Sequence, residues 1–398
     1  MRIRSVRTIR PAIQQNLLFI LLETDEGVTG LGEAFFGAQA VEAYIHETAA
    51  PLLLEMVEVS PESVAVALAP YVGFQGAGAE VRGNAAIDFA LWDALGHSTG
   101  RPLVDLLGGA VRPRLEVYNT CAGTGYVSAT IGQHSENWGL GRSGSYEDLE
   151  AFLTRPGELA RDLLDSGIRG MKVWPFDRAA EASNGTDISR AELAEGIGII
   201  SRIRDEVGLD MKLMVELHGL WNRPAADKIL RALEPYEPYW VEDPIRPDTV
   251  EAYRHLRGRS IPIAAGETVV GRRGALPLLQ AGAIDVLTLD LQWCGGLTEA
   301  RKTASLADTF GVPVAPHDCT GPVSLATGIH LSSSQPNALI QETARAFLHS
   351  WYRELVEGVP EIIDGWIEHT RAPGHGITLR ESVLADPANA TRTSARTR

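Results

Sequence analysis

The sequence predicts an α/β fold in which a parallel barrel follows a smaller N-terminal domain. The chain has 398 residues, more than one ordinary domain contains. An ionisable residue recurs at the end of one apolar segment after another: Glu216, Glu242, Glu267, Asp290, His317 and Glu342. These residues are 26, 25, 23, 27 and 25 positions apart. Such a period accommodates one buried parallel strand, one covering helix and two short connections.

The placement of these residues also predicts an active site. Parallel strands that close into a ring direct all their carboxyl ends to one face, so residues far apart in the sequence converge on one pocket. Six ionisable groups in regular register are unsuited to a hydrophobic core. We therefore expect the chemistry of this protein at the carboxyl ends of the barrel strands.

Composition excludes several classes of protein. The chain is 44% hydrophobic and 22% charged, which is normal for a globular protein, and its formal net charge of -15 argues against a nucleic-acid partner. The three cysteines, Cys121, Cys294 and Cys319, are too few and too scattered for a disulfide framework or a zinc cluster, so we expect a cytoplasmic protein. No apolar run approaches a membrane span or a signal peptide, so no membrane partner is expected.

The first domain begins with strands and continues with helices. An apolar run at 17–24, a turn at Asp25-Glu26-Gly27 and a second run at 28–33 predict an antiparallel hairpin within residues 1 to about 35. Helical periodicity predicts helices over 38–56, 61–72 and 83–96, and the glycine-rich segment 73–78 between them is either a plain connection or a lid. The segment from Pro102 to Gly109 ends this domain.

The barrel is expected to begin at the strand 115–120. A long glycine-rich connection follows, and because long loops in compact domains are usually functional or disordered, we expect part of it over the pocket. Helices are expected over 145–166 and 188–207, with a strand ending near Lys172 between them. The periodicity loosens beyond Glu342, and the small polar residues 388–398 predict a frayed end.

The ionisable residues suggest specific chemistry. Glu216, Glu242 and Glu267 would repel one another at adjacent strand ends unless a cation lay between them. Oxygen ligands without a nearby cysteine favour Mg²⁺ over zinc. A carboxylate beside a histidine fixes the tautomer of the ring and makes it a base, which is the interpretation of Asp290 with His317.

These residues, together with the helix around 85–96 and the motifs Val241-Glu242-Asp243-Pro244 and Gly266-Glu267, resemble the enolase superfamily, specifically its mandelate racemase-like subgroup. The resemblance covers nearly the whole chain. It implies a (β/α)7β modified TIM barrel over 113–369 and an α+β capping domain over 1–112, on which residues 370–398 pack back. It also implies Mg²⁺ on the three glutamates, abstraction of the proton alpha to a carboxylate by His317, a substrate contact from Lys172, and a hydrogen bond from Glu342 to the enediolate.

Two departures from that pattern narrow the reaction. Racemases of the subgroup that this chain resembles share a Lys-x-Lys motif, and the second lysine is a base. This chain has Lys172-Val173-Trp174 in its place. His218 lies two residues after Glu216, on the same side of an extended strand, and is similar to the general acid of sugar-acid dehydratases. Support of the metal site is the alternative interpretation of His218. In the subgroup that this chain resembles, the first metal ligand is commonly Asp, whereas this chain has Glu216.

The sequence therefore predicts a Mg²⁺-dependent acid-sugar dehydratase, a carbon–oxygen lyase that produces a 2-keto-3-deoxy acid. A cycloisomerase or lactone-opening enzyme on a sugar acid is the alternative, followed by a racemase or epimerase and by a homologue without turnover. The expected partners are a small sugar acid and further copies of the chain, from a dimer to an octamer. Residues expected to contact the substrate are Trp174, Phe35, Tyr71 and Asn119.

Overall fold

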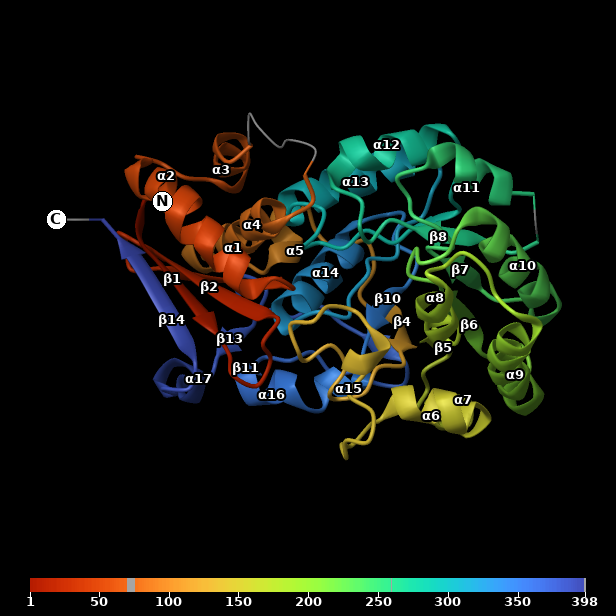
Figure 1. The fold of residues 1–398 in the computed structure, drawn as a ribbon. Coiled ribbons are helices and arrows are strands. Elements are labelled where there is room, and N and C mark those ends of the chain that lie inside the picture. Colours follow the sequence, from red (N-terminus) through yellow and green to blue (C-terminus); the bar gives the residue numbers. More distant parts are fainter. Residues whose placement is uncertain (70–75, 259, 397–398) are drawn as a thin grey trace.

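The computed structural model describes residues 1–69, 76–258 and 260–396. A small antiparallel sheet with helices lies at one side of the molecule, and a ring of parallel strands surrounded by helices forms the rest (Figure 1). This arrangement confirms the predicted fold class, a modified TIM barrel with an N-terminal α+β domain. Within the described ranges, no helix is both long and apolar enough to cross a membrane.

The N-terminal domain pairs four strands in the order β14-β1-β2-β3. Its elements up to the barrel are β1 (Ile3–Arg10), β2 (Leu17–Thr24), β3 (Thr29–Phe35), α1 (Ala38–Tyr44), a π-helical turn (Ile45–Ala49), α2 (Ala50–Glu55), α3 (Pro61–Ala67), α4 (Ala79–Thr99) and α5 (Leu103–Leu106). Helix α4 packs directly on β3 at Gly30 and Gly32. Any side chain at these two positions would collide with backbone carbonyls of the helix, so glycine permits the close contact. The predicted hairpin is therefore part of a larger sheet.

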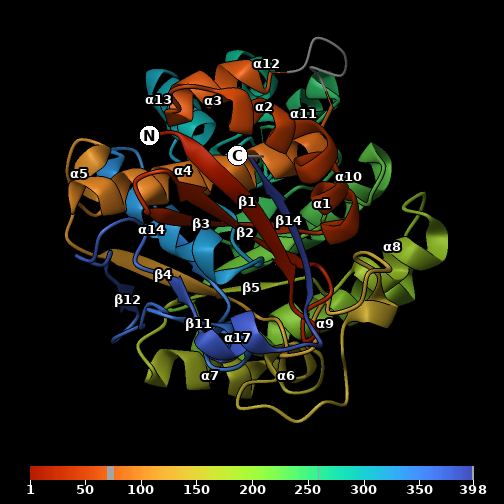
Figure 2. The same ribbon diagram turned by 90° about the vertical axis from the view of Figure 1, so that its left-hand side faces the viewer.

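The end of the chain differs from the sequence-based expectation. Residues Ala390–Ala395 form β14, which pairs antiparallel with β1 from Ser5 to Arg10, and Figure 2 shows the two strands side by side. The expectation of a frayed end over 388–398 was wrong for this stretch. The hydrogen bonds that order it come from a strand almost 400 residues away, so local composition did not indicate them.

The barrel has seven strand–helix units and a final strand. Its elements are β4 (Leu115–Thr120), α6 (Asp148–Thr154), α7 (Pro156–Asp165), β5 (Gly170–Val173), α8 (Asp177–Ser183), α9 (Arg190–Val207), β6 (Lys212–Glu216), α10 (Arg223–Leu233), β7 (Trp240–Glu242), α11 (Val250–Leu256), β8 (Ile263–Ala265), α12 (Gly271–Gln280), β9 (Val286–Leu287), α13 (Leu297–Thr309), α14 (Pro322–Ser334) and β10 (Gln341–Thr343). The seventh strand position is a short extended segment at Val314, bridged to both neighbours. Parallel pairing of β10 with β4 closes the ring.

One predicted helix is divided. The segment expected as a helix over 145–166 forms α6 and α7, which are separated at Arg155. Pro156 is the first residue of α7, and proline disfavours helical backbone at the residue before it. After β10 the chain forms α15 (Arg345–Leu348), α16 (Trp351–Leu355), β11 (Val356–Glu357), β12 (Trp366–Ile367), β13 (Thr378–Leu379) and α17 (Glu381–Ala385) before it reaches β14.

Two buried carboxylates join the domains. Glu33 on β3 accepts hydrogen bonds from the backbone amides of Val323 (2.9 Å) and Ser324 (2.7 Å) in the first turn of α14. Asp88 on α4 accepts from the amide of Thr298 (2.9 Å) in the first turn of α13. Helix N-termini have unpaired amides and a partial positive charge, so these acids are suitable caps. The capping domain is thereby held against the two barrel helices that follow Asp290 and His317.

Candidate active site

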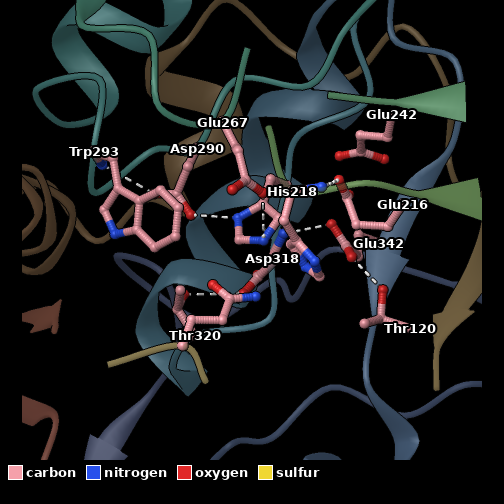
Figure 3. A network of polar contacts seen from close by, with 12 residues as sticks. Thr120, Glu216, His218, Glu242, Glu267, Asp290, Trp293, Asp318, Thr320 and Glu342 are labelled. Atoms are coloured by element: carbon pink, nitrogen blue, oxygen red, sulfur yellow. Dashed lines mark hydrogen bonds and ion pairs between the residues drawn. The ribbon is translucent and has the colours of Figure 1, made fainter. Parts of the chain in front are cut away.

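Three glutamates at adjacent strand ends form the centre of the site. Glu216 and Glu242 are paired residues at the ends of β6 and β7, and Glu267 follows β8. All three are buried, and one carboxylate oxygen from each lies within 4.8 Å of the others. Figure 3 shows their carboxylates gathered around one region of the site. The periodicity of the sequence therefore did predict a cluster in space.

The donor set fits a hard divalent cation. Burial and the neighbouring carboxylates raise the pKa of Glu242 to about 8, although Lys172 opposes the rise. Oε2 of Glu216 is buried and accepts no hydrogen bond from the described residues, although Nζ of Lys172 lies 3.4 Å from it. The single ammonium group of Lys172 does not balance three buried carboxylates, so a further cation among them would be favourable. An all-oxygen set of this kind suits Mg²⁺.

Lys172 lies on one side of the glutamates. Its Nζ atom is 2.9 Å from Glu342, 3.3 Å from Glu242 and 3.4 Å from Glu216. Burial alone would lower the pKa of this amine, but the surrounding carboxylates raise it well above its usual value. Lys172 is therefore a cation fixed at the edge of the cavity that His317 also lines.

Asp290 and His317 form the predicted pair on the other side. Nδ1 of His317 lies 2.8 Å from Oδ2 of Asp290, which leaves Nε2 directed toward the glutamates, 3.3 Å from Oε2 of Glu267. Burial lowers the pKa of His317, yet Glu267, Glu342 and Asp290 together raise it well above its usual value. A cation on Glu267 would offset that rise and leave Nε2 able to accept a proton.

His218 lines the same cavity as Lys172 and His317. Its Nδ1 lies 2.8 Å from Oδ2 of Asp177, and its backbone amide donates to Oε1 of Glu216 at 2.7 Å. Burial opposes the charged ring, but Asp177 and Glu216 raise the pKa of His218 to about 10. The reason given from the sequence for its orientation was wrong, because β6 ends at Glu216 and His218 has a left-handed backbone (φ 50°). The turn, and not an extended strand, places the ring in the cavity.

Glu342 is an acceptor in this arrangement. It receives hydrogen bonds from the Thr120 hydroxyl and from the Asp318 amide (2.8 Å), besides its contact with Lys172. Burial raises the pKa of Glu342, but Lys172 and His317 outweigh it and lower the pKa to about 2. The resemblance implies that Glu342 donates a hydrogen bond to an anionic intermediate. An ionised carboxylate only accepts hydrogen bonds, so Glu342 must take up a proton before it can fill that role.

Comparison with known proteins agrees with this geometry. Residues 156–383 match the family described as enolase C-terminal domain-like, and residues 4–108 match the mandelate racemase/muconate lactonizing enzyme N-terminal domain. This chain belongs to the enolase superfamily. Within the superfamily it has the two-domain organisation of the mandelate racemase-like subgroup.

Several members of the superfamily are similar over much of the chain. A D-gluconate dehydratase from Thermoproteus tenax is 32% identical over 75% of this chain, which spans about half (54%) of that relative. A D-galactonate dehydratase from Ralstonia nicotianae is 29% identical over 97% of this chain and 94% of its own. An enolase of the mandelate racemase subgroup from Agrobacterium tumefaciens is 41% identical, covers 99% of both chains and superposes with a TM-score of 0.88.

The predicted substrate contacts are placed less uniformly than the ionisable residues. In this superfamily member Trp174 lines the cavity, with its ring centre 5.9 Å from that of His218. The rings of Tyr126 (centre 5.3 Å away) and Phe152 (5.2 Å) pack on Trp174, so these aromatic rings form an apolar wall. Tyr71 lies outside the described residues.

Two of the predicted contacts are corrected. Phe35, the last residue of β3, is completely buried and packs on Trp351. Phe36 follows with a left-handed backbone (φ 69°), and this turn directs its ring into the cavity. Asn119 donates to Asp148 (2.8 Å) and accepts from the Arg345 amide (2.9 Å), so its amide group is used in the barrel wall. The neighbouring Thr120 is the strand residue that lines the cavity.

Other residues that line the site were not predicted from the sequence. Asp177 follows the second barrel strand by four residues, and an acid so soon after a strand end is a detectable signal. Tyr126 and Gln133 come from the connection after β4, which Asn16 holds by hydrogen bonds to the carbonyls of Val127 and Ala129 (both 2.8 Å). Trp293 and Arg82, which meet near His317, had no local signal.

Proposed function

We propose that this protein is an acid-sugar dehydratase, a hydro-lyase that converts a sugar acid into a 2-keto-3-deoxy acid. The observation that carries the proposal is the presence of two histidines in one cavity, each with its own carboxylate partner, beside three metal-ligand candidates. The dehydratase names of similar proteins support the reaction class.

Mg²⁺ is the metal proposed for Glu216, Glu242 and Glu267. When bound it would supply a Lewis acid that stabilises negative charge on the substrate carboxylate. The coordination chemistry of the three buried oxygens supports this choice.

The residues of the chain then have separate tasks. Nε2 of His317 accepts the proton from C2 while Asp290 holds the Nδ1 proton and stabilises the imidazolium. Lys172 stabilises the enediolate anion, and Glu342 keeps the ammonium group of Lys172 in place. The cationic His218 donates a proton to the 3-hydroxyl as the C3–O bond breaks, so water leaves and the enol product tautomerises to the ketone.

The experiment separates the two histidines. In deuterated buffer with Mg²⁺ and an acid-sugar substrate, His317→Asn should lose both exchange of the C2 proton and dehydration. His218→Asn should lose dehydration and retain exchange, because the base remains intact. The exposed His255 provides the control, since His255→Asn should retain both activities. Equal loss of exchange in the first two variants would contradict the assigned roles, and a product without a ketone would favour the cycloisomerase alternative.

A further inference from the structure

The cavity beside the proposed catalytic residues contains Arg82, which forms no ion pair with the residues that the structure describes. A hollow of about 440 Å³ extends from His218 and Trp293 to Arg82, on the first turns of α4 in the capping domain. Nε of Arg82 is buried and has no hydrogen-bond partner among the residues that the structure describes. The group is partly buried, and a desolvated guanidinium with an unused donor is unfavourable until an acceptor binds.

Trp293 holds this guanidinium and links it to the catalytic base. The Cζ atom of Arg82 lies 5.3 Å from the centre of the Trp293 ring, within the range of a cation–π contact. The same ring lies 5.1 Å from the imidazole of His317 and 5.9 Å from Phe36. Arg82 is therefore separated from the proposed base by one aromatic ring, that of Trp293.

A substrate in the proposed orientation would extend toward Arg82. The small cavity at Lys172 and His317 adjoins the larger hollow, because both are lined by His218, Trp293, Phe36 and Gln133. If the substrate carboxylate lies at the glutamates and the 3-hydroxyl lies at His218, the carbons beyond C3 would extend into the larger hollow. Its two acids are already engaged, Asp177 by His218 and Glu267 by His317.

We propose that Arg82 binds an anionic group at the end of the substrate remote from the metal site, and that the substrate is therefore a dicarboxylic acid sugar of the aldarate class. This inference rests on the proposed function, which places the first carboxylate. A guanidinium binds a carboxylate through two parallel charge-assisted hydrogen bonds. The terminal hydroxymethyl group of an aldonate would leave the positive charge of Arg82 without compensation.

The test compares pairs of aldarates and aldonates that share the configuration at C2 to C5. The wild-type protein with Mg²⁺ should have a kcat/KM about 10- to 100-fold higher for the aldarate of a pair. Arg82→Gln should lower kcat/KM for the aldarate by a similar factor and leave that for the aldonate within about twofold. Arg82→Lys, which retains the charge and loses the planar fork, should give an intermediate value.

Binding without turnover provides a second measurement. In the His317→Asn background, calorimetry with Mg²⁺ should show tighter binding of the aldarate than of the aldonate, and adding Arg82→Gln should remove the difference. Arg273→Gln is the matched control, because this exposed arginine lines the adjoining hollow and its loss changes the net charge equally. Circular dichroism and thermal melting establish that each variant is folded.

The outcomes are distinguishable. Preference of the wild type for aldonates, equal loss of both substrate classes in Arg82→Gln, or transfer of the discrimination to Arg273 would overturn the role of Arg82. Absence of C2 proton exchange with every acid sugar of either class would instead overturn the proposed function itself.

Discussion

Nδ1 of His218 lies 2.8 Å from Oδ2 of Asp177, although the two residues are 41 positions apart and belong to different strand–helix units. Asp177 is the first residue of α8, and His218 follows β6 through a left-handed turn. The carboxylate is buried and its Oδ1 has no hydrogen-bond partner within the described part of the chain. Asp177 therefore acts as a positioning residue that fixes which ring nitrogen of His218 faces the cavity.

Replacing Asp177 by asparagine should disturb dehydration and spare proton abstraction. An amide can donate to Nδ1 as well as accept from it, so the other tautomer of His218 becomes accessible. We expect kcat for dehydration to fall by about 10- to 100-fold with little change in KM, while C2 proton exchange continues. Asp187→Asn, at an exposed acid paired with Lys228, is the control. Parallel loss of exchange and dehydration would show that Asp177 supports the whole site and not His218 alone.

Replacing Glu242 by glutamine should abolish binding of divalent cations without unfolding the protein. One acidic ligand of three is lost, and the other two, Glu216 at the end of β6 and Glu267 after β8, are held independently of it. Calorimetric titration with Mg²⁺ measures the effect, and Mg²⁺ should raise the melting temperature of the wild type but not of the variant. Glu251→Gln, at an exposed position on α11, should behave like the wild type. An unchanged Mg²⁺ affinity in Glu242→Gln would refute this metal assignment.

The wall formed by Trp174 predicts a stereochemical outcome. Its indole cannot transfer a proton, and the rings of Tyr126 and Phe152 pack against it. The protein should therefore deprotonate one C2 configuration and should not interconvert epimers. Chiral analysis of substrate recovered from deuterated buffer checks this prediction. Formation of the C2 epimer would reveal a second base, and comparison with His218→Asn would show whether His218 is that base.

His330 should make stability depend on pH between about 3 and 6.5. Burial lowers the pKa of this α14 histidine to about 3, assisted by the charges of His369 and His375. Its ordinary pKa is about 6.5, so in this window the unfolded chain holds a proton that the folded chain lacks, and stability rises with pH. The contribution is fully present above pH 6.5 and is lost as the pH falls toward 3.

Urea denaturation at several pH values measures this effect. His330→Gln should reduce the slope of the unfolding free energy against pH by up to about 1.4 kcal/mol per pH unit. Nδ1 of His330 accepts from the Val104 amide at 3.2 Å, a role that the glutamine oxygen can take over. His97→Gln is the control, because the hydrogen bond to Asp93 raises the pKa of His97 and moves its titration above the window. An unchanged slope in His330→Gln would refute the assignment.

Much of the site was predictable because it depends on a regular repeat. Strands of a closed parallel sheet end at one face, so the recurrence of ionisable residues was enough to bring Glu216, Glu242 and Glu267 together and to set His317 beside Asp290. Glu342 belongs to the same recurrence, whereas Lys172 was predicted from its place at the end of a separate strand. The fold class followed as well, because one strand and one helix require a fixed length of chain.

Only the tertiary structure decided what surrounds that set. Phe36 and not Phe35 lines the cavity because of one turn at the end of β3, and the turn at His218 brings its ring to Asp177. Arg82 reaches the site from the capping domain. The position of that domain on the barrel depends on Glu33 and Asp88, which cap two barrel helices. The physical reason is that side-chain direction in a repeat follows from its period, whereas direction at irregular chain ends follows from dihedral angles and contacts distant in sequence.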